Sequence, residues 1–251
     1  MRKIFLLLSA TVFLVSCSKN KYVISGTVKG VEDGKTVILE TQDAAGMGLV
    51  AVDTVKVENG KFEIEGKASE PAFHMLQVEG VNGKVPFILE NGDISIEINK
   101  DTLNKSKISG TYNNDEFSAF NKDLEKVQKP LIDFQTKNTQ AMNVAQQTKD
   151  TVVINQLMAE FGKIQQSVGE STKKTYVTYA ETHPKSFISA LIIQGMTGDP
   201  TVDIKKVEKL YASLDESLKT TKPGKAIDTK IKEAKNAPPL PTAPVGPATA
   251  N

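Results

Sequence analysis

The sequence predicts an α+β protein, with an N-terminal antiparallel β-sandwich or barrel-like domain followed by a C-terminal helical region. Two observations carry this prediction. Between residues 21 and 112, short runs rich in Val, Ile and Phe alternate with turn residues. From residue 113 onward, apolar residues recur at intervals of three and four, which is the period of an amphipathic helix.

Six or seven strands are expected in the β-rich domain of residues 21–112. They cover residues 22–28, 35–40, 50–57, 61–65, 73–78, 85–90 and 93–99. Asn59-Gly60 and Asn91-Gly92 each separate two of these runs. Because Asn and Gly both accept positive φ, each pair predicts a β-hairpin.

The helical region, residues 113–235, should begin at Asn114, which can cap a helix whose first turn holds Asp115 and Glu116. Its buried stripe would contain Phe117, Phe120, Leu124 and Val127. Pro130 should bend or restart this helix, and the polar residues 135–150 are expected to form an exposed extension or loop. Further helices are expected at residues 152–179, 186–194, 202–214 and 225–235, and the second of these four segments follows the break at His183-Pro184.

The long helix at 152–179 should bury a second stripe, which consists of Ile154, Leu157, Met158, Phe161, Ile164 and Val168. Residues 236–251 include five prolines, which disfavour helix and inner strand, so a disordered or polyproline tail is expected there.

The first residues have the layout of a secretory signal peptide. Arg2 and Lys3 precede an apolar run from Ile4 to Val15, which is too short to span a bilayer permanently. Leu14-Val15-Ser16-Cys17 resembles the lipobox of bacterial lipoproteins, in which the cysteine is lipidated and becomes the first residue of the mature chain. Residues 1–16 are therefore the expected signal peptide, Cys17 the lipidation site, and residues 17–20 the lipidated N-terminus and tether.

Composition excludes several chemistries. The single cysteine is committed to lipid, so the mature chain is expected to have no disulfide, catalytic thiol or thiolate metal site. Two histidines make a multi-histidine zinc site improbable, and no cofactor is expected. Without residues 1–16 the chain has 29 basic and 30 acidic residues, a net charge of −1. This balance gives no support to nucleic-acid binding.

The order of the parts resembles a known arrangement. After the lipobox come Ser25-Gly26-Thr27-Val28, the junction Ile108-Ser109-Gly110-Thr111-Tyr112-Asn113, and His183-Pro184-Lys185-Ser186 before an apolar stretch. Over nearly all of residues 17–235 this is similar to an uncharacterised domain found at the N-terminal end of thioredoxin/AhpC-TSA-like lipoproteins of Gram-negative bacteria. In those proteins a thioredoxin domain with Cys-x-x-Cys usually follows. No catalytic residue of the family can be placed on this sequence.

Neither histidine predicts a catalytic site. His74 should share a strand face with Leu76 and Val78, which favours a half-buried structural role over a ligand role. His183 is interpreted as a turn residue before Pro184, and neither histidine has a nearby acid and serine in the sequence that would suggest a triad.

The acidic pairs are expected to be solvated. They are Glu32 with Asp33, Glu63 with Glu65, and Asp115 with Glu116. The Asp-Ala-Ala-Gly-Met-Gly segment at 43–48 should be a flexible hairpin loop, and this loop and the region near Asp53-Thr54 are modest candidates for a ligand surface. The apolar helix stripes are interpreted as core, with an exposed groove or dimer face as the alternative.

The leading functional hypothesis is a lipid-anchored cell-envelope accessory or binding module without catalytic activity. It would be held by acyl chains on Cys17, with an envelope protein or a second copy as partner and no nucleic acid. Ser18-Lys19-Asn20 lacks an acidic cluster, which favours an outer-membrane anchor facing the periplasm. Two alternatives are a partner or remnant of a thioredoxin-like thiol-disulfide lipoprotein and a hydrolase that uses carboxylates on the β-domain loops.

Overall fold

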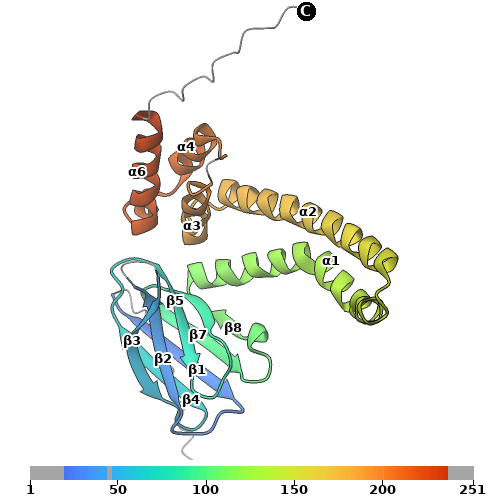
Figure 1. The fold of residues 1–251 in the computed structure, drawn as a ribbon. Helices are drawn as coiled ribbons and strands as arrows, with labels where there is room; N and C mark the ends of the chain where they lie inside the picture. The colour runs from blue at the N-terminus through green and yellow to red at the C-terminus, as the bar shows by residue number, and fades with distance from the viewer. Residues whose placement is uncertain (1–19, 44–46, 200, 237–251) are drawn as a thin grey trace, which may run out of the picture. The chain divides into compact units, whose positions relative to one another are not determined.

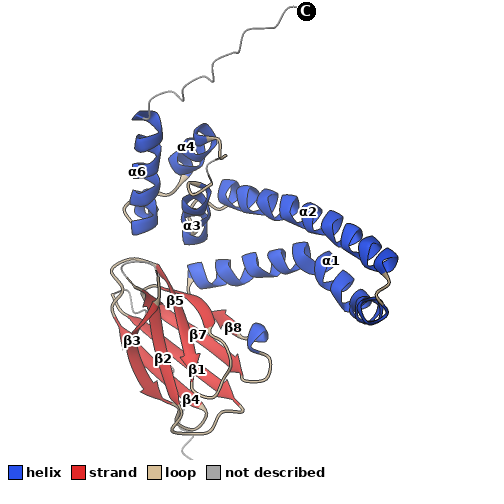
Figure 2. Ribbon diagram, viewed as in Figure 1, coloured by secondary structure: helices blue, strands red, loops and turns tan. Residues whose placement is uncertain are grey.

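The computed structural model describes residues 20–43, 47–199 and 201–236. They form two compact units that divide between Asp115 and Glu116 (Figure 1). The first unit is rich in strands and the second is helical, as Figure 2 shows. The predicted α+β class is confirmed. The expected signal peptide, Cys17 and the tail from residue 237 onward lie outside the described residues.

The first unit contains two four-stranded sheets. Their strands are β1 Tyr22–Lys29, β2 Thr36–Gln42, β3 Leu49–Lys56, β4 Lys61–Gly66, β5 Ala72–Val78, β6 Val85–Leu89, β7 Gly92–Asn99 and β8 Lys107–Ser109, and a short 3-10 helix, Leu103–Lys105, precedes β8. One sheet has the order β4-β1-β7-β8 and the other β3-β2-β5-β6. The central pair β1 and β7 is parallel, which corrects the expectation of a wholly antiparallel domain.

One apolar core lies between the two sheets, so the unit is a β-sandwich. In β1 and β7 every second residue is buried, as the strand period of two requires. Ile24 of β1 lies beside Ile64 of β4 and Ile94 of β7, and all three are at most 1% exposed. Leu39 and Phe87 from the other sheet belong to the same core and are fully buried.

Both predicted Asn-Gly hairpins are wrong, although the chain turns where predicted. Asn59 and Gly60 have φ of 53° and 68°, and Glu58 and Lys61 exchange two backbone hydrogen bonds around them. The strands on either side, β3 and β4, nevertheless belong to different sheets. The same holds for β6 and β7 around Asn91-Gly92. Each turn therefore carries the chain across the sandwich from one sheet to the other.

The second unit consists of a long pair of helices and a cluster of shorter ones. α1 spans Tyr112–Thr148 and begins in the first unit, α2 spans Thr151–Thr182, and α3 to α6 span Phe187–Met196, Ile204–Ser213, Glu216–Lys219 and Lys222–Asn236. α2, α3 and α4 begin at side-chain caps, in which Asp150, Ser186 and Asp203 accept backbone N–H bonds of the first turn. α3, α4 and α6 pack together around Ile193, Val207 and other buried apolar residues.

α1 continues as one helix through Pro130, so the helix does not restart there. It also includes residues 135–148, for which an exposed extension or loop was expected. Thr136 and Thr139 donate to carbonyls four residues earlier, which gives their hydroxyls partners inside the helix. Phe134 also packs against Phe161 of α2, with ring centroids 6.0 Å apart. Packing against α2 therefore stabilises this part of α1, which the polar composition of residues 135–148 did not indicate.

The predicted helix stripes are buried unevenly. Phe120 is 6% exposed, and its ring packs against Tyr176 and Tyr179 of α2. Met158, predicted to point inward, is 57% exposed, and the other residues of the second stripe are only partly buried, which corrects the prediction of a buried stripe there. A pair of helices has only one seam between them, so a position at the edge of the apolar stripe stays in water.

Candidate functional site

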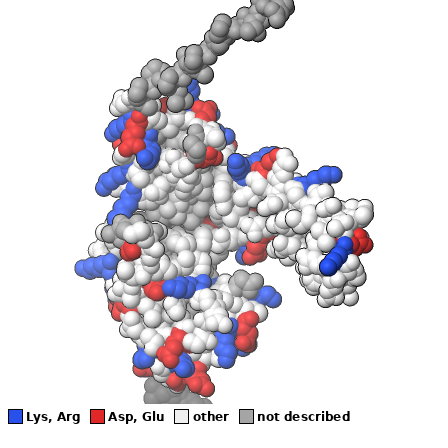
Figure 3. Space-filling view, viewed as in Figure 1, with Lys and Arg blue, Asp and Glu red and all other residues white. Residues whose placement is uncertain are grey.

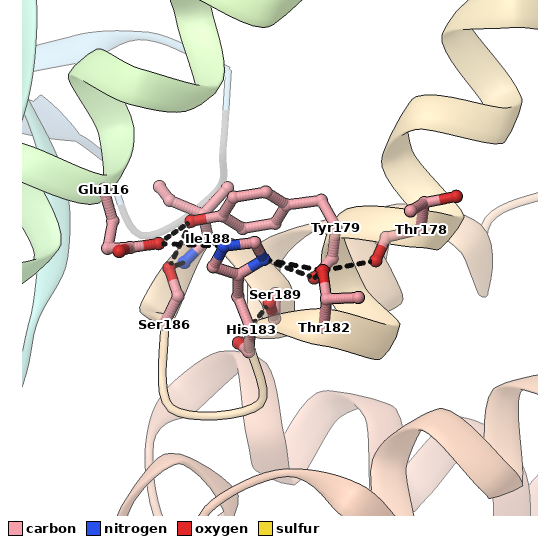
Figure 4. Close-up of polar contacts among 8 residues, drawn as sticks. All are labelled: Glu116, Thr178, Tyr179, Thr182, His183, Ser186, Ile188 and Ser189. Atoms are coloured by element: carbon pink, nitrogen blue, oxygen red, sulfur yellow. Dashed lines mark hydrogen bonds and ion pairs between the residues drawn. The ribbon is translucent and has the colours of Figure 1, made fainter.

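A cluster of polar side chains lies where the first turns of α1, the end of α2 and the start of α3 meet (Figure 4). Tyr179 is at its centre and is 8% exposed. Its hydroxyl donates to Glu116 Oε2 over 2.6 Å and lies 3.0 Å from Ser186 Oγ. The hydrogen bond to a carboxylate is charge-assisted and therefore strong, so it ties α1 to α2.

His183 closes the cluster on one side. Its ring stacks on Tyr179, with centroids 4.2 Å apart and planes 7° from parallel. Nδ1 lies 2.8 Å from Thr182 Oγ1 and 3.2 Å from the Tyr179 carbonyl oxygen, while Nε2 is 3.9 Å from Glu116 Oε2. His183 is therefore more than the predicted turn residue, because it belongs to a network that joins three helices.

No acid and serine were predicted near His183, but the structure places Glu116 and Ser186 in the same cluster. Glu116 precedes Tyr179 by 63 residues, so only folding brings it to the end of α2. Ser186 is three positions after His183, but its role as an α3 cap hid it among ordinary helix starts.

The arrangement nonetheless does not have the geometry of a catalytic triad. Ser186 Oγ accepts a hydrogen bond from the backbone N–H of Ile188 and lies against the Tyr179 hydroxyl, and the residue is fully buried. A nucleophile must be within reach of both its base and the substrate. The His183 carbonyl is held by Ser189 over 2.7 Å, which further fixes the α2–α3 turn. The chemistry of this cluster is that of a structural junction.

His74 has the structural role that the sequence predicted. It is 8% exposed and shares the inner face of β5 with Leu76 and Val78. Its Nδ1 lies 3.1 Å from the Ala72 carbonyl oxygen, and its ring tilts toward Phe87 at a centroid distance of 6.2 Å. Burial lowers the pKa of His74 below 6.5, because the apolar surroundings disfavour the imidazolium ion.

The predicted carboxylate pairs separate into solvated and engaged groups. Glu63 and Glu65 are exposed, and Glu65 pairs with Lys21 at 2.7 Å, as expected for the outer face of a strand. Asp33 accepts a hydrogen bond from the Gly60 N–H over 3.0 Å, and backbone hydrogen bonds of this kind lower its pKa. Glu116 is the exception, because it turns toward Tyr179 instead of water.

The acidic residues of the two loop candidates for a ligand surface accept hydrogen bonds from nearby backbone N–H groups. Asp43 Oδ1 accepts from the Met47 N–H over 2.9 Å, and residues 44–46 between them lie outside the described part. Asp53 Oδ1 accepts from the Thr54 N–H over 2.7 Å. Within the described ranges no cluster of three or more His, Cys, Asp or Glu residues is arranged to hold a metal ion.

Asn114 has a different role from the helix cap that was predicted. It lies inside the first turn of α1, so it is not the helix cap that was predicted. Its side-chain amide instead accepts from the Ile88 N–H over 2.9 Å and donates to the Ile88 carbonyl over 2.7 Å. Because β6 is an edge strand, this amide occupies hydrogen-bonding positions that another strand would fill.

Lys side chains and acidic side chains are interspersed over the face of the β-rich unit seen in Figure 3. Among the helices of the described ranges, none combines the length and the apolar character that crossing a membrane requires.

Comparison with known proteins gives a family match for the β-rich region. Residues 22–117 match the model of a family described as "Domain of unknown function (DUF4369)", and no thioredoxin domain was detected. Searches of curated proteins and of solved structures found no match. The match covers β1 to β8 and the start of α1. The expected resemblance to an uncharacterised domain is thus confirmed, but the match covers residues 22–117 and not the expected 17–235.

Proposed function

We propose that this chain is a lipid-anchored accessory or binding module of the bacterial cell envelope, without catalytic activity of its own. The acyl chains on Cys17 hold it at the outer membrane, facing the periplasm. The observation that carries the anchoring is the signal-peptide layout that ends in Leu14-Val15-Ser16-Cys17. Two or more acyl chains give stable attachment, whereas one alone binds only marginally.

The polar cluster of the helical unit supports the non-catalytic part of the proposal. Its serine hydroxyl is buried and engaged at a helix start, and its tyrosine hydroxyl bonds a carboxylate. These bonds connect α1, α2 and α3, so they serve the shape of the unit. A module of this kind acts by presenting a surface to an envelope protein or to a second copy of itself.

Mass spectrometry of the N-terminal peptide tests the anchoring. The mature chain made in a Gram-negative host should begin at Cys17 and carry a diacylglyceryl group and an amide-linked acyl chain. Cys17→Ser should keep residues 1–16 attached or leave the membrane fraction, while the neighbouring Ser18→Ala should be processed and anchored normally. An unmodified peptide from membrane-bound protein would refute the proposal.

Cross-linking in intact envelopes tests the binding role. The anchored chain should recover a specific envelope protein or a cross-linked pair of its own copies, and the Cys17→Ser chain should recover less because it is no longer concentrated at the membrane. A chain that is correctly lipidated but yields only monomer at every cross-linker length would contradict the binding role.

A further inference from the structure

One corner of the β-sandwich exposes apolar side chains to water. Met47 is 87% exposed, Leu49 41% and Phe73 39%. We call these three residues the apolar corner. Leu49 of β3 is paired with Gln42 of β2, and Phe73 of β5 precedes His74, which is paired with Thr41. Met47, Leu49 and Phe73 line an open groove of about 450 Å³. Apolar side chains gathered at one place gain free energy when they leave water together.

The apolar corner differs from the rest of the sandwich surface. Among described residues of the first unit, the other exposed large apolar side chains are Tyr112 in α1 and Val50 and Val52, which lie in β3 next to the corner. The outward positions of β1, β4 and β7 are instead mostly polar or charged, as Glu63 and Glu97 illustrate. Exposed apolar surface is therefore concentrated at one place on this unit.

The pairing of the strands shows which end of the sandwich carries the apolar corner. β1 and β7 are parallel, so both begin at the same end. β6 ends there, because only Glu90 and Asn91 separate it from β7. β5 is antiparallel to β6 and begins there, and by the same rule β2 ends and β3 begins there. Leu49 and Phe73, at the starts of β3 and β5, thus share an end with the start of β1.

The lipidation site lies a short length of chain from this same end. Residues 18–21 separate Cys17 from Tyr22, where β1 begins. A fully extended chain over this interval reaches about 18 Å at most. Acyl chains on Cys17 would therefore keep the start of β1, and the end of the sandwich that it defines, close to the lipid headgroups.

We propose that the apolar corner rests on the lipid bilayer in which Cys17 is anchored, so that the sandwich is held against the membrane by two contacts. This inference rests on the proposed lipidation. Met47, Leu49 and Phe73 would enter the interface between headgroups and acyl chains, where apolar side chains are stable and strand edges can remain hydrated. The second contact limits how the domain rotates about its tether.

Site-specific labelling of the lipidated full chain tests this inference. Met47→Cys and Lys100→Cys would each carry an environment-sensitive fluorophore. Lys100 is exposed at the end of β7, away from the start of β1. The only native cysteine is blocked by lipid, so the label is unique. The proteins would be reconstituted in vesicles of phosphatidylethanolamine and phosphatidylglycerol.

Quenching by two agents then reports the surroundings of each label. A nitroxide on the lipid acyl chains should quench the label at 47 several-fold more than the label at 100, and aqueous iodide should show the reverse order. Leu49→Ser with Phe73→Ser should reduce lipid quenching at 47 without changing the mass of the N-terminal peptide. Val152→Ser is the matched control, because it removes an exposed apolar side chain from α2, outside the β-sandwich.

The outcomes separate this inference from the proposed function. Equal quenching at 47 and 100 on a chain with confirmed acyl groups overturns the docking of the corner and leaves the lipid anchor intact. Protection of the label at 47 from both agents means that protein covers the corner, which also overturns the inference. An N-terminal peptide without acyl groups refutes the proposed function, and the docking of the corner falls with it.

Discussion

Replacing Asn114 by Ala should lower the stability of the first unit far more than the corresponding change at Asn91. Both side-chain amides make the same pair of hydrogen bonds to one residue's backbone. Asn114 bridges the N–H and C=O of Ile88 at 2.9 and 2.7 Å, and Asn91 bridges those of Ala68 at 2.9 and 2.8 Å. The two sites differ in burial, because Asn114 is 0% exposed whereas Asn91 is exposed.

The size of the expected loss in stability follows from the two backbone groups of Ile88 that lose their partners. Without the Asn114 amide, a buried donor and a buried acceptor of Ile88 lose their partners, and each unsatisfied group costs about 1–3 kcal/mol. The expected loss in the free energy of unfolding is therefore about 2–6 kcal/mol, a large share of the roughly 5–15 kcal/mol that stabilises a typical domain. At Asn91 water takes over the bonds, so the loss should stay within about 1 kcal/mol.

Urea denaturation of the chain from Ser18 onward measures this difference. Amide hydrogen exchange in β1 and β7 would report the first unit separately from the helices. Asn114→Asp should also destabilise strongly, because it keeps the acceptor for the Ile88 N–H but sets a carboxylate oxygen against the Ile88 carbonyl. If Asn114→Ala and Asn91→Ala lowered stability by the same amount, the argument from burial would be wrong.

Three further predictions concern other parts of the chain. Gly26→Ala would place a Cβ 2.0 Å from two ring atoms of Phe62, so it should cost about 1–3 kcal/mol in urea denaturation, and Phe62→Leu in the same chain should recover part of that loss. Gly224→Ala would place a Cβ 2.2 Å from the Leu218 carbonyl oxygen, and backbone atoms cannot move aside as a side chain can. The midpoint temperature of thermal unfolding should therefore be lower than for Gly162→Ala, whose Cβ meets nothing within 4 Å. Because burial lowers the pKa of His74, the unfolded chain binds a proton at this residue below pH 6.5 more readily than the folded chain does. The contribution of His74 to stability is therefore complete above pH 6.5 and declines as the pH falls toward the lowered pKa. His74→Gln should flatten this part of a plot of urea midpoint against pH.

The class of each region followed from the spacing of its apolar residues. Period two along β1 and β7, and period near 3.6 along α4 and α6, are local properties, because they depend on which face of one element is buried. The caps Asp150 and Ser186 are local as well, since each bonds the N–H of a residue two positions later. Elements of these kinds were therefore predictable one at a time.

The sheet assignment was not predictable in this way. Asn59, Gly60 and Gly92 have positive φ, which lets the chain turn at Asn59-Gly60 and Asn91-Gly92, but a turn does not determine which strand its arms pair with. β1 pairs with β4 and β7, which are distant in sequence, because their inward Ile residues fill the same core. The parallel β1–β7 pair exists only through such long-range packing.

The polar cluster and the β6 edge show the same limit. The local pattern predicted that Glu116 is an acid of the first helical turn and that Asn114 is a helix cap. In the structure Glu116 instead accepts a hydrogen bond from Tyr179, and Asn114 bonds the backbone of Ile88 at the edge of the sheet. No local pattern indicates either partner. A buried polar group takes whichever partner the fold brings to it, because remaining unpaired costs more than leaving the local pattern.

The sequence by itself determined the α+β class, the position of most helices and strands, and the Cys17 motif on which the proposed anchoring rests. Each of these depends on neighbours along the chain. The tertiary structure decided which strands share a sheet, that α1 runs through Pro130, and which end of the sandwich carries the apolar corner. These depend on contacts between residues far apart in sequence, whose free energy appears only when the core has formed.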